Sequence, residues 1–351
     1  MSTTPELRSA APRSHDELQE LLRATTGRVR LVGGGSRQHR LPEAGDALRV
    51  RLDGIASIER LDGPDQTCSV DCGVPRHELD AALGPLGLEL PCPGQGTLGG
   101  LFAADPIGAA APGGAGPRSL LLGAEAVLAD GTRFRSGARV VKSVAGFDVH
   151  KLVVGSVGRL FVITRLHLRL KPRPRAEQWF ENGGLSLAEA IALVQRLRQL
   201  ATGVLALQLE WHHESGATVR GRIGGRSAFV GELVRTHDLT ASDRTWRDHA
   251  TVDPRDEVLA MQVLPGQLPA LLAAAPTART LLWHGGNRCE LALADAASSD
   301  ATLAVLPRLS LGARIVGGPP ARRGRSTPLD PTFDRLTRDL VRTFDPHGRF
   351  A

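Results

Sequence analysis

Apolar positions recur with helical spacing near the start of the chain. In "SHDELQELLRATTG", Leu18, Leu21 and Leu22 fall on one face of a helix. Ser14 is a suitable N-cap, and Glu17 three residues later completes a capping-box pattern. The sequence therefore predicts an amphipathic helix that begins after Ser14 and ends at the next glycine.

Strand-like alternation dominates the remainder of the first half. The runs "RVRLVGGG", "ALRVRLDGIASIERL", "QTCSVDCGV" and "RLFVITRLHLRLKP" alternate as strands, and "PRHELDAALGPLG" predicts a short helix. The segment "LLLGAEAVLADGTRFRSG" predicts a β-hairpin that turns at Asp130-Gly131. This half is therefore expected to be built mainly from antiparallel strands.

The pattern changes after "KPRPRAE", which predicts a domain boundary near residues 171–176. Beyond it, "SLAEAIALVQRLRQL", "SAFVGELVRTHDL" and "GQLPALLAAAP" predict helices, and "GVLALQLEWHH", "ATVRGRIGG" and "TLLWHGGNRCELAL" predict strands. The tail "LDPTFDRLTRDLVRTFDPHGRFA" predicts a last helix that stops at Asp345-Pro346. The predicted fold class is α+β, with one domain over residues 1–175 and a small α+β domain over residues 176–351.

Composition narrows the class of protein. The chain has 351 residues, of which 42% are hydrophobic and 23% charged, as in ordinary globular proteins. No run of about eighteen apolar residues is present, and the N-terminus lacks the apolar core of a signal peptide. We therefore predict a cytoplasmic protein without a membrane span, which reaches the inner membrane face only through partners.

The charge balance is basic but gives no sign of nucleic-acid binding. The net charge is +6, yet the arginines are scattered over the whole chain rather than arranged in a stripe. Aromatic residues make up only 4% of the chain, so stacking platforms for bases are not evident. An arginine-biased surface is the favoured interpretation, with an anionic ligand or an acidic partner subunit as alternatives.

The four cysteines, Cys68, Cys72, Cys92 and Cys289, form no C-x-x-C motif, so neither a zinc ribbon nor an iron–sulfur cluster is encoded. Cys68 and Cys72 lie on one predicted strand, where four residues span roughly 13 Å. That separation is too long for a disulfide. All four are expected to be reduced.

Two glycine-rich loops could hold an anion. The first, "LVGGGSRQHR", follows a predicted strand, and three glycines let backbone amides converge without Cβ clashes. A Rossmann fingerprint starting at Gly33 would need glycine at Gln38, and the P-loop sequence G-K-[ST] occurs nowhere. Neither common nucleotide motif is present, and an ordinary tight turn stays the alternative.

The second loop, "PCPGQGTLGGLFAADPIG", runs from Pro91 to Gly108. Two prolines stiffen its entry, its glycines open the backbone, and Thr97 offers a hydroxyl. Nothing in this run is expected to form a core by itself. Because predicted strands flank it closely, we interpret it as a second loop that binds a diphosphate. Two such loops could hold the diphosphate from both sides without the help of a helix dipole. A linker is the alternative.

These loops belong to a longer series of motifs. "VGGGSRQ", "PGQGTLGG" with "FAADPIG", "VLADGTRFR" and "VKSVAGFDVHKLVVGSVGRLFVIT" resemble, in order and spacing, the PCMH-type FAD-binding domain of the vanillyl-alcohol oxidase family. Within it, "VVKSVAGFDVHKL" is similar to a run in the FAD-binding subunit of bacterial glycolate oxidase. The resemblance is strong from Gly27 to Pro174. It implies a two-subdomain FAD-binding domain followed by a FAD-linked oxidase C-terminal (cap) domain with a returning C-terminal helix.

The resemblance also implies noncovalently bound FAD and the residues that bind it. The first loop would wrap the pyrophosphate with amides, and the second would cover the pyrophosphate and the flavin edge. The run from Val144 would lie by the flavin and ribityl side, and the run from Gly155 would approach the adenine through its main chain. The implied cofactor-binding residues are Gly33, Gly34, Gly35, Ser36, Arg37, Gln38, Pro93, Gly94, Thr97, Gly99, Gly100, Val144, Ala145, Gly146, Phe147, Asp148, Lys151, Gly155, Ser156, Gly158, Val162 and Ile163.

The chain departs from the family at several positions. Asp105 and Ser143 replace common asparagines, and Phe147 replaces a tyrosine. Loss of the tyrosine hydroxyl removes one hydrogen-bonding group but keeps the aromatic face. His39 lies past the position where relatives carry a flavin-linked histidine, which is why noncovalent FAD is expected. The "FDPHGRFA" end resembles the family tail, cut short.

No catalytic residue is assigned from the sequence. Relatives that oxidise D-hydroxy acids with a metal carry paired histidines and an H-x-G-D-G-N-type run, and "WHGGNRCE" echoes that run without its acid. His212 and His213 are adjacent, so a strand would point them to opposite faces. His284 and Arg314 do not stand out from the background. No metal site is predicted.

Three functions are open at this point. The resemblance implies a FAD-binding subunit of a glycolate (2-hydroxy acid) oxidase complex, with a second flavoprotein subunit and an iron–sulfur subunit as partners. A stand-alone FAD-dependent oxidoreductase of a small hydroxylated substrate is the alternative. A non-catalytic scaffold on a flavin fold is the third.

Only three lysines occur, against 43 basic residues in total, and Lys142 and Lys151 lie within the flavin-side run. Both coincide with lysines of the family run. An ammonium is a compact charge that fits a tight apolar seam better than a guanidinium fork. Both lysines could contact FAD, the substrate or a partner subunit, or could simply lie on the surface, and the sequence does not decide between these roles.

Overall fold

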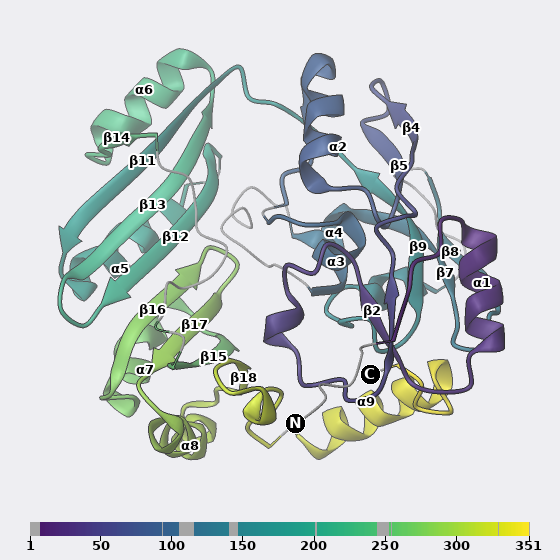
Figure 1. Ribbon diagram of the computed structural model, residues 1–351. Coiled ribbons are helices and arrows are strands. Elements are labelled where there is room, and N and C mark those ends of the chain that lie inside the picture. The colour runs from purple at the N-terminus through teal and green to yellow at the C-terminus, as the bar shows by residue number, and fades with distance from the viewer. Residues whose placement is uncertain are drawn as a thin grey trace, which may run out of the picture.

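The computed structural model describes residues 8–92, 94–104, 116–139, 147–200, 202–243, 253, 255–328 and 330–350. Within that part of the chain the buried apolar side chains form two separate cores. One core extends from Leu18 to Leu170 and includes Phe350, and the other extends from Phe180 to Ile315. Figure 1 shows the two bodies side by side. The predicted boundary at residues 175/176 falls between strands β10 and β11.

The first body contains two larger sheets that enclose one core, together with a short antiparallel pair formed by β6 and β10. A three-stranded parallel sheet has the order β1-β3-β2, and a five-stranded antiparallel sheet has the order β4-β5-β9-β7-β8. The strands are β1 (Ser9–Ala10), β2 (Val29–Val32), β3 (Leu48–Arg51), β4 (Ile58–Asp62), β5 (Thr67–Asp71), β6 (Leu88–Glu89), β7 (Leu121–Val127), β8 (Arg133–Gly137), β9 (Val162–Arg169) and β10 (Lys171–Pro172). The strand runs and the hairpin turning at Gly131 are confirmed.

Short helices connect these strands. They are α1 (His15–Ala24), η1 (Gln38–Arg40), α2 (Arg76–Leu83), η2 (Gly84–Leu86), α3 (Leu98–Ala104), α4 (Pro117–Leu120) and η4 (Val149–Val153). In α1 the predicted N-cap is confirmed, since the Ser14 hydroxyl accepts from the Glu17 amide at 3.1 Å. The capping box is only half formed, because the Glu17 carboxylate accepts instead from the Arg13 amide at 2.8 Å.

The second glycine-rich loop contributes a helix to the first core, which the sequence did not predict. Residues 98–104 form α3, and Leu98, Leu101 and Phe102 are completely buried in the first core. Their spacing of three and one residues places them on one helical face. The adjacent Gly99-Gly100 pair obscures this pattern in the sequence, because glycine is a poor helix former.

The second body is an eight-stranded sheet with helices on one face. Its order is β14-β11-β13-β12-β16-β17-β15-β18. The strands are β11 (Ala176–Leu185), β12 (Val204–His212), β13 (Gly216–Gly225), β14 (Ala241–Ser242), β15 (Glu257–Gln262), β16 (Ala278–His284), β17 (Arg288–Leu293) and β18 (Ala313–Gly317). The helices are α5 (Leu187–Arg198), α6 (Ser227–Thr236), η5 (Pro265–Gln267), α7 (Leu268–Ala274), α8 (Ala296–Val305), η6 (Leu306–Leu309) and η7 (Pro320–Arg322).

Strand alternation makes the two faces of this sheet chemically different. Leu207 and Leu209 of β12 join the core under the helices, whereas Gln208 and Glu210 lie on the opposite face. Two ion pairs connect that polar face to the first body, Arg222–Glu89 at 2.9 Å and Arg40–Glu290 at 2.8 Å. The polar face of the second body is therefore directed at the first.

The last helix, α9 (Pro331–Phe344), returns to the first body (Figure 1). As predicted, it stops at Asp345-Pro346. Phe344 packs edge-on to Phe161 with ring centroids 5.4 Å apart. The tail then forms a parallel bridge between Phe350 and Val29, and the Val29 amide donates to the Arg349 carbonyl at 2.7 Å. The end of the chain therefore extends the edge on which β2 lies.

The remaining expectations concern cysteines and membranes. All four cysteines are free, as predicted, and all four are also buried; burial raises the pKa of the Cys68 thiol to about 12. Within the described residues, no helix combines the length and the apolar character needed to cross a bilayer.

Replacing Arg349 should destabilise the first body. Its guanidinium donates to the carbonyls of Leu22 (2.9 Å), Thr25 (2.5 Å) and Ala129. Arg349→Ala leaves these acceptors without their charged donor, which should cost about 2 kcal/mol or more. Urea unfolding should show a lower midpoint for this variant. Arg342→Ala, on the exposed side of α9, is the control, and equal loss in both variants would contradict the assignment.

Candidate functional site

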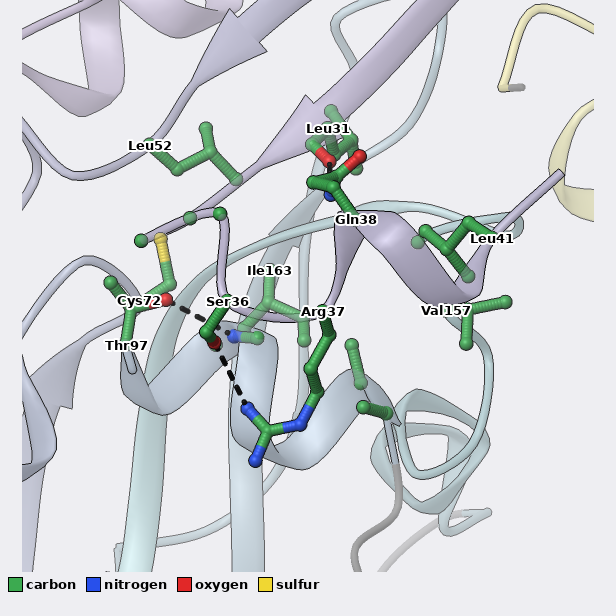
Figure 2. Close-up of a pocket in the computed structure, with 18 of the residues that line it drawn as sticks. Leu31, Ser36, Arg37, Gln38, Leu41, Leu52, Cys72, Thr97, Val157 and Ile163 are labelled. Carbon is green, nitrogen blue, oxygen red and sulfur yellow. Dashed lines mark hydrogen bonds between the residues drawn. The ribbon is translucent and has the colours of Figure 1, made fainter. Parts of the chain in front are cut away.

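A pocket lies in the first body, between the two sheets (Figure 2). The loop residues Gly34, Gly35 and Ser36 are exposed, whereas apolar side chains of the lining, such as Cys72 and Phe161, are buried. The residues that line it are Leu31, Gly33, Gly34, Gly35, Ser36, Arg37, Gln38, Leu41, Leu52, Cys72, Thr97, Gly99, Gly100, Ala103, Ala104, Val157, Gly158, Phe161 and Ile163. The two glycine-rich loops therefore meet at one site, although about sixty residues separate them.

The loops interlock so closely that side chains would not fit between them. A Cβ at Gly33 would lie 2.1 Å from the Thr97 hydroxyl oxygen, and one at Gly96 would lie 2.6 Å from the Ser36 hydroxyl oxygen. Arg37 reinforces the contact by donating to the Gln95 carbonyl at 2.8 Å. The glycines are thus required by the approach of one loop to the other.

The first loop presents a row of backbone donors. Within the described part of the chain, the amides of Gly33, Gly34, Gly35 and Ser36 donate to no acceptor. Consecutive backbone N–H groups without acceptors form a concave site for an anion. The side chain of Gln38 donates to the Leu31 carbonyl at 3.1 Å, which ties the end of the loop back to β2.

The second loop is hydrogen-bonded to the start of α2 and to the residue that follows β5. The Gly96 carbonyl accepts from the Arg76 amide at 2.9 Å, and the Gly99 amide donates to the Cys72 carbonyl at 2.7 Å. A Cβ at Gly99 would lie 2.7 Å from the Cβ of Cys72. These contacts disfavour the linker interpretation. They also show that Gly99 is required for packing, so its replacement would test the fold as well as ligand binding.

One side of the pocket is an apolar wall. Leu31, Leu52, Cys72, Phe161 and Ile163 come from both sheets and their connections. Burial raises the pKa of the Cys72 thiol to about 12, so the thiol is neutral and contributes as an apolar group. A flat heteroaromatic ring is the kind of group that such a wall accepts.

The pocket brings together about half of the residues implied by the resemblance. Gly33 to Gln38, Thr97, Gly99, Gly100, Gly158 and Ile163 line it. Seven others are described but do not line it, namely Gly94, Phe147, Asp148, Lys151, Gly155, Ser156 and Val162. Pro93, Val144, Ala145 and Gly146 lie outside the described residues, as do Lys142, Ser143, Asp105 and the side chain of His39.

For three of these seven residues the structure shows an environment other than the pocket. Val162 is fully buried in the core, since strand alternation points it away from its neighbour Ile163. Phe147 is 92% exposed. Lys151 donates from Nζ to the carbonyls of Arg118 (2.7 Å) and Leu121, and burial lowers its pKa. Contact of these residues with FAD stays a prediction.

Sequence reasoning missed most of the apolar lining, including Leu31, Leu41, Leu52, Cys72 and Phe161. Alternation along β2 and β9 indicates which side chains share a face. It does not indicate which strands become neighbours across the pocket, and that pairing decides the lining.

The polar face of the second body carries paired buried charges. Arg220 binds Glu181 and Glu210, each at 2.5 Å, and these bonds raise its pKa although burial acts in the opposite direction. Glu290 lies 2.8 Å from Arg40 and 3.5 Å from Arg288. Each of these carboxylates is therefore held in place by at least one guanidinium group.

Two histidines were candidates in this body. His284 is buried on the polar face, with its Nδ1 3.3 Å from Nε2 of Gln208. His212 lies at the end of β12, with its Nε2 3.3 Å from Glu210. Among the described residues, no three His, Cys, Asp or Glu side chains are grouped to hold a metal ion.

Comparison with known proteins relates the first body to FAD-binding proteins. Residues 7–137 match the family described as FAD binding domain. Over 192 residues the chain is 32% identical to the glycolate oxidase subunit GlcE of Escherichia coli, a match that covers 52% of each chain. It is 30% identical over 175 residues to the D-lactate dehydrogenase of Archaeoglobus fulgidus, covering 47% of this chain and 38% of that one. The chain spans about half, or less, of the length of these relatives.

Two solved structures of alkyldihydroxyacetonephosphate synthase, in different crystal forms, share the fold over 97% of this chain. Their TM-scores are 0.71 and 0.67 at 14% sequence identity, and the match covers 75% and 76% of those chains. The predicted PCMH-type fold with a following α+β domain is therefore confirmed.

Gly34 offers a clean test of the cofactor site. A Cβ there would lie 3.6 Å from the Thr97 methyl group, an ordinary contact, so Gly34→Ala should fold normally. The added methyl group would occupy the pocket beside the open amides and should lower FAD affinity at least tenfold. Flavin content after purification and FAD titration of the apoprotein would measure this.

Gly63→Ala is the matched control, because a Cβ at Gly63 would have no neighbour within 4 Å. Unchanged FAD affinity in Gly34→Ala would contradict the assignment of the first loop.

Lys151 should stabilise the segment around η4. Lys151→Met removes a charged donor from the carbonyls of Arg118 and Leu121, which should cost about 2 kcal/mol. Lys151→Arg should restore only part of the loss, because a planar guanidinium cannot reproduce a point-like ammonium in this seam. Thermal unfolding measures both variants. Full rescue by arginine would contradict this account.

The residues present fit FAD. The four open amides suit its diphosphate, and the apolar wall suits a ring. When bound, FAD supplies two-electron redox chemistry through its isoalloxazine ring. The chain contributes the loops that hold and orient it, with Arg37 as the cation beside the amides. The first body therefore has the PCMH-type fold of FAD-binding domains, and its cofactor is FAD.

Proposed function

We propose that this chain is a FAD-dependent oxidoreductase and serves as the FAD-binding subunit of a glycolate (2-hydroxy acid) oxidase complex. In this role it passes electrons between the flavin that meets the substrate and an iron–sulfur partner. The observation that carries the proposal is the 32% identity to a glycolate oxidase subunit over half of each chain. The substrate and the partners belong to the proposal.

The polar face of the second body supports a subunit role. Oxidation of a hydroxy acid needs a base for the hydroxyl proton. The buried carboxylates of this face, Glu210 and Glu290, are each held in an ion pair with an arginine, so neither is free to approach a substrate hydroxyl. This arrangement suits electron transfer within an assembly better than substrate oxidation by the chain alone.

Helix α9 offers a surface for another subunit. Phe333 and Leu336 are 68% and 52% exposed, and Leu340 continues their stripe along the same face. An exposed apolar stripe on a helix is typical of a protein–protein contact. We place a contact with the second flavoprotein subunit on this stripe.

A stand-alone oxidoreductase is the second candidate. It is favoured by the similarity to D-lactate dehydrogenase and by the buried pair of His284 and Gln208 on the polar face. A neutral imidazole there would have the chemistry of a general base. A non-catalytic scaffold is disfavoured, because a chain without cofactor would have no use for four open amides at one loop.

Anaerobic reduction of the bound flavin separates the two candidates. We expect glycolate and D-lactate to leave the flavin of the purified chain oxidised, and the partner subunits to restore reduction. Visible absorbance of the flavin measures both steps. Rapid reduction of the lone chain would favour the stand-alone enzyme, and a chain that takes up no FAD would remove both candidates.

The stripe on α9 should carry subunit contacts. Leu336→Asp should reduce co-purification of a flavoprotein and an iron–sulfur protein with the tagged chain by at least tenfold, since a charge would be placed in an apolar contact. Its own FAD content should not change. Leu264→Asp, at a similarly exposed leucine of the second body (53%), is the control. Equal yields of partner with both variants would exclude α9 as the contact.

A further inference from the structure

A second cavity adjoins the FAD pocket and is lined by six arginines. Arg28, Arg30, Arg40 and Arg159 come from the FAD binding domain. Arg314 comes from β18, and Arg323 from the segment after η7. The cavity encloses about 280 Å³, far more than the roughly 15 Å³ that one water needs. It lies at the junction of the two bodies.

The positive charge of this cavity is poorly compensated. Within the described part of the chain, only Arg40 among the six forms an ion pair, with Glu290 beneath it. Glu43 is the single acidic member of the described lining, and it forms no ion pair. Arg30 and Arg323 each donate to one carbonyl, of Pro42 and Gly318. The side chains of the other three arginines donate to no described acceptor.

Burial and mutual repulsion act together on two members. Burial, and then the charges of Arg159 and Arg28, lower the pKa of Arg30. Burial, and then the charges of Arg288, Arg159 and Arg40, lower the pKa of Arg314. Like charges brought together without counter-ions disfavour their own ionised state. An anion in the cavity would reverse this effect.

The cavity differs in chemistry from the FAD pocket. Leu41 and Val157 line both and form the wall between them. On the FAD side the polar groups are backbone amides, the uncharged side chains of Ser36, Gln38 and Thr97, and a single guanidinium, Arg37, whereas on this side guanidinium groups predominate. Val157 adopts φ +47°, and a branched residue is strained in that region. Strain of this kind persists where the surroundings require one backbone position, here between two sites.

We propose that this arginine cavity binds a small multivalent oxyanion, either a phosphate ester or a polycarboxylate, at the junction of the FAD binding domain and the second body. The planar fork of arginine donates in parallel to two oxygens of a phosphate or a carboxylate. Six forks around one cavity suit a ligand with more than one such group. The cavity is enclosed by both bodies, which suits a small molecule. This site is independent of the proposed redox function.

The test is calorimetric titration of the FAD-loaded chain at constant ionic strength. Pyrophosphate is one probe, citrate is the other, and acetate is the singly charged control. We expect saturable binding of a multivalent probe, with the preferred probe identifying the phosphate or the carboxylate source. Arg314→Gln and Arg159→Gln should each weaken it more than tenfold, because both are exposed to the cavity and make no side-chain bond that folding needs.

Arg308→Gln, an exposed arginine elsewhere in the second body, is the charge-matched control and should bind as the parent does. The preferred probe should also raise the unfolding temperature of the parent chain in proportion to its concentration. Absence of saturable binding by both probes, or equal affinity in all variants, would overturn the proposal. Loss of FAD from the Arg314 or Arg159 variants would overturn it as well, by assigning the cavity to the flavin site.

Discussion

The candidate cofactor pocket depends on one close approach, between the backbone of Gly33 and the side chain of Thr97. Gly33 leaves the parallel sheet at the end of β2, and Thr97 precedes α3 next to the antiparallel sheet. A Cβ at Gly33 would lie 2.1 Å from the Thr97 hydroxyl, so a side chain at this position would separate the two layers. The contact directs the amides of the first loop into the cavity and closes the apolar wall behind them. It also sets the start of η1, from which Arg40 reaches Glu290 in the second body.

The position of β2 is in turn supported by the end of the chain. The Phe350 bridge and the Arg349 carbonyl bind the start of β2 at Val29. The Arg349 guanidinium binds the end of α1, and the Asp345 carboxylate accepts from the amides of both tail residues. A strand at the edge of a three-stranded sheet is weakly held by itself. The tail supplies the missing hydrogen bonds. Residues at the end of the chain therefore hold in place the glycine loop after β2, which is expected to bind FAD.

Much of this architecture can be predicted from the sequence, because its local signals agree with the fold. Alternation predicted the strands of the first sheets, and Asp130-Gly131 marked the hairpin turn. The glycine loop was recognisable because its composition is unusual. The helix α3 was hidden, since Gly99 and Gly100 interrupt its apolar face. The strand β11 was also missed, because it carries polar residues on both faces and its partners are distant in sequence.

The candidate site could be predicted only where it consists of main chain. The loop from Gly33 to Gln38 can be recognised by its composition. In the sequence, Leu31, Cys72 and Phe161 cannot be told from other core residues, because they become pocket residues only through the pairing of the two sheets. The arginine cavity illustrates the same limit. Its members are dispersed from Arg28 to Arg323, so a scattered distribution in the sequence becomes a cluster in space.

The preference of this chain for arginine over lysine has a structural reason, which a comparison of their contacts shows. Arg220 and Arg222 each reach two carboxylates, a geometry that needs a planar fork with several donors. Lys151 instead meets two backbone carbonyls in a narrow seam, where a compact ammonium suffices. Buried ion pairs contribute little net stability, because the cost of desolvation offsets the attraction between the charges. A shift of one body against the other would, however, leave a buried charge without its partner, which is strongly unfavourable. The pairs Arg222–Glu89 and Arg40–Glu290 therefore define the position of the second body over the FAD binding domain more than they strengthen the contact.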